Sequence, residues 1–143
     1  MVYTMFHMKQ FTSKTQKIGE YGEKICTQWL GNNGFKILDL NYTLSIGEID
    51  IIAQKNNQLH FIEVKSVSCE NTDFVTRETL YNPAENVTRE KIAKCYKVMR
   101  HYLKEHNVSC ETQFDVYLVY IDKRNIKHKI EKIENVFISD RKY

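Results

Sequence analysis

The sequence predicts a mixed α/β domain in which a helix precedes three strands and a second helix precedes a fourth strand. Apolar residues recur at helical spacing within residues 15–32 and 88–106. The segments after each of these helices are rich in β-branched and aromatic residues, which is typical of strands. Three consecutive strands form a meander, so helices from two parts of the chain must cover a mixed central sheet.

The composition is typical of one folded domain. The chain has 143 residues, of which 42% are hydrophobic and 27% charged, and this balance excludes a disordered tail. No apolar run reaches the roughly 18–20 residues of a membrane span, so we expect no membrane association. We expect a flexible N-terminal arm over residues 1–14 and a single domain over residues 15–143.

The cysteines and the N-terminus favour the cytoplasm. The first residues lack the small-residue cleavage site of a secretory signal. The cysteines contain no Cys-x-x-Cys pair of the kind that structural zinc sites use, and they are too sparse for a disulfide scaffold. We therefore expect reduced thiols and a cytoplasmic protein. The cysteines are Cys26, Cys69, Cys95 and Cys110.

The remaining elements follow from turn residues and periodicity. Gly34 ends the first helix, and Thr88 lies in the capping segment that begins the second. We expect a long loop over residues 67–85, because this stretch is polar and has no period. The expected strands are residues 35–44, 48–53, 59–66 and 113–121, with turns at 45–47 and 56–57 and an edge element over residues 126–137.

The first helix predicts which of its side chains face the sheet. Its apolar arc runs through Tyr21, Ile25 and Trp29, with Glu23 at the edge of that arc and Glu20 on the polar side. Glu23 is therefore placed to reach the sheet. The glycines of this helix, Gly19 and Gly22, predict that it packs closely against the strands.

Acidic residues interrupt two apolar strands, and a buried carboxylate is costly unless it is paired or binds a metal. Strand alternation places Glu48 and Asp50 on the face opposite Ile49 and Ile51. It likewise places Glu63 and Lys65 together, opposite Ile62 and Val64. If the two strands pair through the turn at 56–57, Asp50, Glu63 and Lys65 converge. This trio suits Mg²⁺-dependent phosphoryl chemistry, and a cross-strand salt bridge is the structural alternative.

Positive charge is concentrated in the second half of the chain. Residues 1–75 contain seven Lys and Arg, and residues 76–143 contain fourteen. On the second helix a basic stripe of Lys94, Lys97, His101 and Lys104 suits contact with a phosphate backbone. Lys91 lies between this stripe and the apolar face and could lean towards the sheet. The alternative is that these charged side chains only form the solvent-exposed face of the helix.

These motifs together resemble the YraN-like family, small bacterial proteins of the PD-(D/E)xK nuclease superfamily. The resemblance covers about residues 15–121 and rests on five motifs in order. They are Gly-Glu-x-Gly-Glu at 19–23, Gly-Glu-Ile-Asp-Ile-Ile-Ala at 47–53, Phe-Ile-Glu-Val-Lys at 61–65, Asn-Val-Thr-x-x-Lys at 86–91 and Phe-Asp-Val at 114–116.

The resemblance implies a restriction-endonuclease-like core similar to that of archaeal Holliday-junction resolvases. It assigns the motif's two acids to Asp50 and Glu63, its lysine to Lys65 and a helix-borne glutamate to Glu23. The implied metal is Mg²⁺, or Mn²⁺ in its place, with Asp50, Glu63, Glu23 and the Val64 backbone carbonyl as ligands. Nucleic-acid contacts are then expected from Lys91, Lys94, Lys97 and Lys104.

The chain departs from the family pattern at two places. Ser66-Val67-Ser68 lacks the arginine of a Thr/Ser-x-Arg pattern, and Asn41-Tyr42-Thr43 lacks the basic residue of Asn-x-Arg. Both departures remove phosphate contacts and leave the metal ligands intact.

Three functions stay open at this stage. The first is a metal-dependent endonuclease acting on DNA, including branched or damaged DNA, with a homodimer compatible with its resolvase-like relatives. The second is a nucleic-acid-binding protein with a silent nuclease site. The third is a protein-interaction module that uses its tyrosines and phenylalanines.

Overall fold

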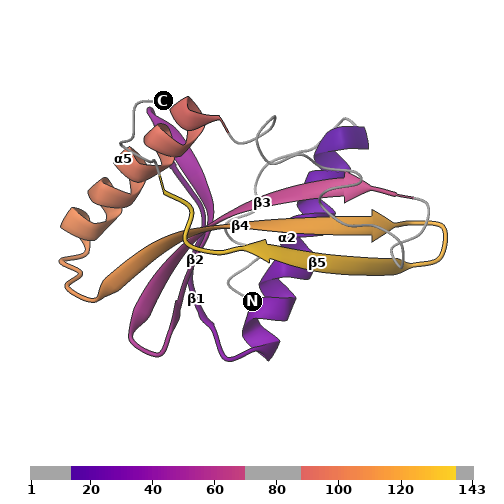
Figure 1. The fold of residues 1–143 in the computed structure, drawn as a ribbon, viewed down its shortest axis with the longest axis horizontal. Helices are drawn as coiled ribbons and strands as arrows, with labels where there is room; N and C mark the ends of the chain where they lie inside the picture. The colour runs from indigo at the N-terminus through magenta and orange to yellow at the C-terminus, as the bar shows by residue number, and fades with distance from the viewer. Residues whose placement is uncertain (1–13, 70–87, 138–143) are drawn as a thin grey trace.

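The computed structural model describes residues 14–69 and 88–137, which form a five-stranded mixed sheet with two helices (Figure 1). The predicted α/β class and the order helix, three strands, helix, strand are confirmed. The sheet order is β1-β2-β3-β4-β5, so β1 and β5 are its edges. The elements are α2 (Lys14–Asn32), β1 (Lys36–Leu44), β2 (Gly47–Lys55), β3 (Gln58–Ser68), α5 (Arg89–Glu105), β4 (Glu111–Asp122) and β5 (Lys127–Ile133).

The predicted boundaries agree with the observed ones to within two residues, except at the end of the edge strand. Val67 and Ser68 continue β3 instead of opening the predicted loop, and β5 ends at Ile133, earlier than expected. Most of that loop, residues 70–85, lies outside the described residues, as does the predicted N-terminal arm up to residue 13. Within the described parts of the chain, neither helix is long and apolar enough to cross a membrane.

The connections decide how the strands run. β1, β2 and β3 pair antiparallel, with Asn56 and Asn57 in the left-handed region at the β2–β3 turn, as a tight hairpin requires. β3 and β4 pair in parallel, and α5 lies in the crossover between them. The β4–β5 hairpin completes the sheet.

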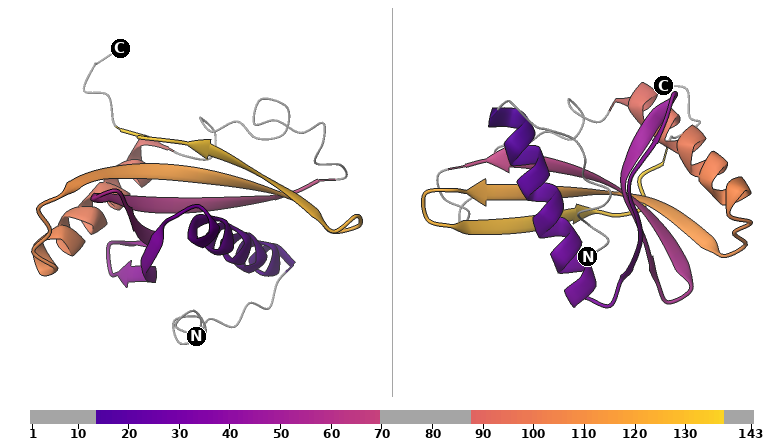
Figure 2. Two further views of the ribbon diagram at one scale, coloured as in Figure 1. Left: turned by 90° about the horizontal axis from the view of Figure 1, so that it is seen from below. Right: turned by 180° about the vertical axis from the view of Figure 1, so that it is seen from behind.

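Two apolar clusters fill the space between the sheet and its helices. α2 contributes Ile25, Cys26 and Leu30 to one cluster, and α5 contributes buried residues such as Val98 and Tyr102 to the other. The two helices therefore cover opposite faces of the sheet (Figure 2). The helical wheel was right for the α2 core residues but wrong for Tyr21, which is exposed.

The two glycines of α2 behave differently from one another. A Cβ atom at Gly22 would lie 1.8 Å from the Ser66 hydroxyl oxygen, so this glycine allows the helix to approach β3 closely. At Gly19 a Cβ atom would meet nothing within 4 Å. The prediction of close packing is therefore confirmed for Gly22 and wrong for Gly19.

Strand alternation fails at Asp50. Ile49 packs in the cluster under α5, whereas Ile51 packs in the cluster under α2, so the prediction that they share a face is wrong. The neighbouring strand has its own irregularity at the same level, because Asn41 has a φ of 52° between the pairs that join Leu40 to Ile51 and Tyr42 to Ile49. The β1–β2 ribbon turns over here, which carries it from one helix to the other.

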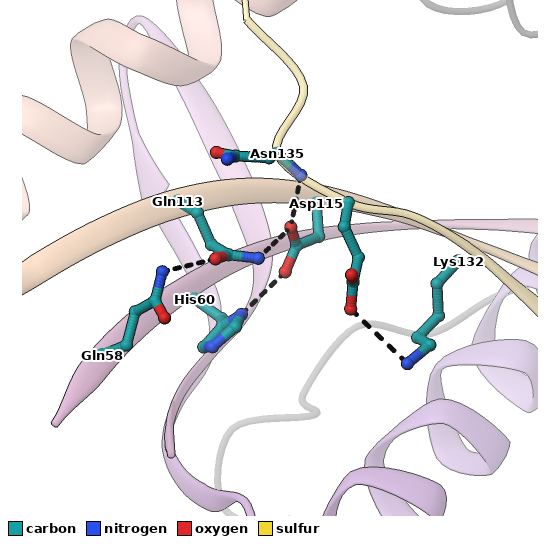
Figure 3. A network of polar contacts seen from close by, with 7 residues as sticks. Gln58, His60, Gln113, Asp115, Lys132 and Asn135 are labelled. Atoms are coloured by element: carbon teal, nitrogen blue, oxygen red, sulfur yellow. Dashed lines mark hydrogen bonds and ion pairs between the residues drawn. The ribbon is translucent and has the colours of Figure 1, made fainter. Parts of the chain in front are cut away.

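A buried polar network at the other end of β3 explains the Phe-Asp-Val motif (Figure 3). The Asp115 carboxylate is fully buried and lies 2.8 Å from His60 Nδ1. It also accepts hydrogen bonds from the Gln113 side chain (2.7 Å) and the Asn135 backbone amide (2.9 Å), and Gln113 accepts one from Gln58. Asp115 thus ties β3, β4 and the segment after β5 together, which is a structural role.

Candidate functional site

The candidate site lies where β2 and β3 separate. Their ladder ends at the pair Ile51–Ile62, although β2 begins at Gly47 and β3 continues to Ser68. β3 remains paired with β4 along its whole length, so only its β2 side opens. The result is a fork between two strands, with α2 on one face and α5 on the other.

Asp50 bridges this fork. Its carboxylate accepts a 2.8 Å hydrogen bond from the backbone amide of Val64. The amide and carbonyl of one residue in a strand point to the same side, so the Val64 carbonyl also faces the fork. A side-chain carboxylate and a backbone carbonyl are thereby directed to the same gap.

The surroundings of Asp50 disfavour the charged form of its carboxyl group. Its side chain is buried, and burial raises its pKa well above the usual range. The negative charges of Glu63 and Glu23 raise this pKa further, and the Val64 hydrogen bond only partly offsets them. Glu48 adds a smaller effect in the same direction. Among the described residues, the groups with the largest effects on this pKa are acids and the Val64 amide, and none of them is a cation.

Glu63 and Lys65 occupy the α5 side of β3, as alternation predicts. Lys65 Nζ lies 3.4 Å from Glu63 Oε1, and both side chains are partly buried. Lys91 of α5 reaches the same oxygen at 3.8 Å, so two ammonium groups meet one carboxylate. Burial and the charge of Lys65 lower the pKa of Lys91, while Glu63 acts in the opposite direction.

The second helix is anchored so that Lys91 can make this contact. The Thr88 hydroxyl caps α5 by accepting a 3.2 Å hydrogen bond from the Lys91 backbone amide. The predicted inward lean of Lys91 is confirmed, and it separates this residue from the rest of the helix's basic residues. Lys94, Lys97 and Lys104 are exposed, and we refer to them as the α5 basic stripe. His101 does not continue that stripe freely, because its ring lies 3.0 Å from the Tyr42 hydroxyl and 3.6 Å from Glu105.

A cleft of about 520 Å³ opens over the site between the β1–β2 turn, β3 and the start of α5. Five of its lining residues were not among the predicted site residues: Gly47, Glu48, Thr88, Glu90 and Cys95. Glu48 lies two residues before Asp50 in the same motif, so a second acid there could have been predicted as part of the site. Cys95 gave no such signal; burial and the charges of Glu63 and Asp50 raise the pKa of its thiol to about 12. The cleft is lined by Gly47, Glu48, Glu63, Thr88, Glu90, Lys91, Lys94 and Cys95.

Glu23 approaches the site from the other face. It lies on α2 and is partly buried, and its charge raises the pKa of both Asp50 and Cys26. This position agrees with the helical wheel, which put Glu23 at the edge of the apolar face. Asp50 and three neighbouring glutamates (Glu23, Glu48 and Glu63) outnumber the two lysines of the site (Lys65 and Lys91), so the site has an excess of negative charge when Asp50 is ionised.

The donor set suits a hard divalent cation held by few protein ligands. Within residues 14–69 and 88–137, no group of three or more His, Cys, Asp or Glu side chains is arranged to hold a metal ion. Mg²⁺ does not need such a cage, because one or two carboxylates with waters and phosphate oxygens suffice. Asp50, Glu63 and the Val64 carbonyl could supply oxygen ligands of this kind.

Comparisons with known proteins agree on one family. The profile described as "Uncharacterised protein family UPF0102" matches residues 22–119. A UPF0102 protein of Caldanaerobacter subterraneus is 35% identical over 132 residues, which cover 91% of this chain and all of the relative. One of Clostridioides difficile is 39% identical, covering 77% of this chain and 90% of the relative. One of Campylobacter hominis is 37% identical, covering 86% and 96%. This chain therefore belongs to the UPF0102 family, which is the YraN-like family its motifs resemble.

Proposed function

We propose that this protein is a metal-dependent endonuclease that hydrolyses phosphodiester bonds of DNA at the fork between β2 and β3. The single observation that most supports the proposal is Asp50. This carboxylate is buried near other acids and accepts a hydrogen bond from the Val64 amide. Buried carboxylates whose pKa is strongly raised are frequently part of functional sites.

The proposed metal ligands are Asp50, Glu63 and the Val64 carbonyl, with Glu23 completing the site from α2. The proposed ion is Mg²⁺, for which Mn²⁺ could substitute. A bound divalent ion would acidify a water ligand and neutralise charge on the phosphate. Asp50 would be ionised in that state, because the cation offsets the burial and the neighbouring charges that raise its pKa.

The two lysines have separate roles in this proposal. Lys65 is held against Glu63 at 3.4 Å and would orient the attacking water and the scissile phosphate. Lys91 contacts the same carboxylate from α5 and would stabilise the charge that develops on the phosphate oxygens. The water oxygen would bond to phosphorus as the bond to the leaving oxygen breaks. The water would lose its proton to solvent, and the leaving alkoxide would take a proton from solvent.

DNA binding would use the α5 basic stripe, which lies on the helix that borders the cleft. Lys94 lines the cleft, and Lys97 and Lys104 continue the charge along the exposed side of α5. Contacts of this kind neutralise phosphates without reading sequence. The substrate would then be selected by its shape, which suits branched or damaged DNA, and a homodimer could present two such sites.

A cleavage assay tests the proposal. Labelled branched, single-stranded and duplex DNA would be incubated with the wild type in Mg²⁺, Mn²⁺ or EDTA, with Asp50→Asn as the inactive control. We expect metal-dependent products from the wild type and none from the variant. Tight DNA binding without cleavage under any condition would instead favour a binding protein with a silent site. Neither binding nor cleavage would favour a protein-interaction module.

The interaction-module alternative has weaker support. The large apolar residues that are exposed among the described residues fall on separate elements and turns; they are Tyr21, Leu38, Ile46, Ile126 and Phe137. We also propose that the protein acts in the cytoplasm, where its thiols would stay reduced. All four cysteines are free in the structure.

A further inference from the structure

The turn between β4 and β5 presents an unusual residue. Six non-glycine residues in the described part of the chain have a left-handed φ, and five of them are asparagines. The exception is Ile126, with a φ of 53°. Asparagine tolerates this conformation, whereas a β-branched side chain does so only with strain. The same Ile126 is 84% exposed, so burial does not compensate for the strain.

The strained turn is fixed by its own side chains. The Asp122 carboxylate accepts hydrogen bonds from the backbone amide of Asn125 at 3.1 Å and from its side-chain amide at 2.8 Å. Asp122 and Lys127 then close the strand pair. The hairpin therefore holds Ile126 at its tip in one conformation, pointing an apolar group into water. Local strain that the surrounding structure enforces is a sign of function.

Positive charge surrounds this apolar tip. Residues 123–129 contain four lysines and arginines and a histidine, without an acidic residue. Four of these cationic or titratable side chains are exposed: Lys123, Arg124, Lys127 and His128. Such a cluster attracts phosphates and was not part of the basic stripe on α5.

The sheet register places this hairpin beside the candidate site. Lys65 pairs with Leu118 of β4, which pairs with Glu131 of β5. Lys129 and Lys127 share the face of Glu131 by alternation, and they lie roughly 12 Å and 16 Å from Lys65 at ordinary strand spacings. The α5 helix and the β4–β5 turn lie at opposite ends of the molecule's long axis, with β3 between them (Figure 1).

We propose that the β4–β5 hairpin is a DNA-binding wedge. Its lysines and Arg124 hold the phosphates of a duplex, and Ile126 inserts at a base step whose stacking is already weakened by a nick or a mismatch. This inference rests on the proposed action on DNA and adds a selected substrate, a duplex with a destabilised step. Apolar side chains flanked by basic residues open base steps in this way.

A membrane surface is the competing partner for a basic hairpin with an apolar tip. A single isoleucine buries too little apolar area for stable anchoring, which generally takes two signals. The position of the hairpin on the face of Lys65, beside a site suited to phosphodiesters, favours DNA.

The test compares Ile126→Asn with wild type in EDTA, where DNA binds without being cut. Affinities are measured by fluorescence anisotropy for an intact duplex and for the same duplex with a central nick, and 2-aminopurine beside the nick reports unstacking. We expect the wild type to prefer the nicked duplex by about tenfold and to brighten 2-aminopurine. Ile126→Asn should lose both effects but keep its affinity for the intact duplex. Its urea midpoint should rise, because asparagine relieves the strain.

Two controls separate the roles within the hairpin. Replacing Lys123, Arg124 and Lys127 together with glutamine should weaken binding to both duplexes and flatten the salt dependence by up to about 3 in slope. Leu38→Asn, which removes an exposed apolar side chain from β1, should change neither affinity nor 2-aminopurine signal.

Several outcomes overturn the inference. An Ile126→Asn protein with wild-type nick preference and 2-aminopurine signal would remove the wedge. Binding of the hairpin to vesicles of anionic phosphatidylserine, with no hairpin-dependent DNA binding, would assign the surface to membranes. If the hairpin variants bind DNA normally while the wild type cleaves it, only the wedge fails. If Ile126→Asn loses its nick preference but the wild type never cleaves, the nuclease proposal fails and the wedge stands.

Discussion

The Asp50 carboxylate accepts a 2.8 Å hydrogen bond from the Val64 backbone amide where β2 and β3 part. The contact replaces the strand-to-strand bonding that would have continued if the ladder had not ended at Ile51 and Ile62. It fixes one acid at the head of the fork and leaves Glu63, one residue earlier on β3, on the α5 side. The fork and the acid therefore arise together from one break in the sheet.

Asp50→Asn should stabilise the metal-free protein while abolishing any metal-dependent cleavage. An asparagine oxygen can still accept the Val64 hydrogen bond, but it does not repel Glu63 and Glu23. The gain should be on the order of 1 kcal/mol, the value of one pKa unit, and would be measured as a higher urea midpoint in EDTA. A midpoint clearly below wild type would mean that Asp50 is a structural ion-pair partner.

The same carboxyl should make wild-type stability depend on pH. Because its pKa is raised in the folded state, the native protein holds a proton that the unfolded chain has released. The free energy of unfolding should therefore fall as pH rises above about 4, by up to about 1.4 kcal/mol per pH unit, until the raised pKa is passed. Urea titrations from pH 4 to 8 should show this slope in wild type and a flatter one in Asp50→Asn. Equal slopes in both proteins would contradict the assignment.

Lys91→Ala should lower turnover far more than DNA affinity. Its ammonium lies 3.8 Å from Glu63 and serves the reacting phosphate in our proposal, so cleavage should drop by about 10²-fold with less than about a twofold change in Kd. Single-turnover rates and anisotropy measure the two effects separately. Lys24→Ala is the matched control, because the exposed Lys24 pairs with Glu20 of the same helix at 3.8 Å, and this variant should cleave normally. Normal turnover by Lys91→Ala would confine this residue to supporting α5.

The α5 basic stripe should set the salt dependence of binding. Each phosphate contact contributes about −0.9 to the slope of log K against log salt for duplex DNA. Replacing Lys94, Lys97 and Lys104 with glutamine should thus flatten the slope by up to about 3 and weaken all sequences alike. An unchanged slope would show that these exposed lysines are only solvated.

Periodicity predicted β3 well and β2 poorly, and the difference has a physical cause. In β3 each alternate residue keeps its face, so Glu63 and Lys65 lie together as expected and Ile62 and Val64 lie opposite. In β2 the ribbon turns over beside Asn41, so Ile49 and Ile51 separate. Alternation assumes a regular strand, and a single sequence seldom shows where two paired strands twist together. In this sequence Asn41 is a weak sign of such a place, because asparagine tolerates a left-handed φ.

Long-range partners were the other limit. The helical wheel placed Glu23 and Lys91 at the edges of their apolar faces, which was enough to point each towards the sheet. It did not show that Lys91 would share the Glu63 oxygen with Lys65, because that contact depends on how α5 crosses the strands. The strain at Ile126 was invisible for a different reason: isoleucine is a residue that local propensity never assigns to a left-handed turn.

Gly22 and Gly19 provide a matched pair for the packing of α2 on β3. Gly22→Ala would bring a Cβ atom to 1.8 Å from the Ser66 oxygen and 2.9 Å from its Cβ, so helix or strand must shift. We expect a loss of about 1–3 kcal/mol in unfolding free energy, as for other overpacked sites. Gly19→Ala adds a methyl group to open space within the same helix, so it should gain about 0.5–1 kcal/mol from helix propensity. Urea unfolding of both variants measures the difference. Equal effects would contradict the close approach of α2 to Ser66. Because Ser66 directly follows Lys65, Gly22→Ala should also slow cleavage, while Gly19→Ala should not.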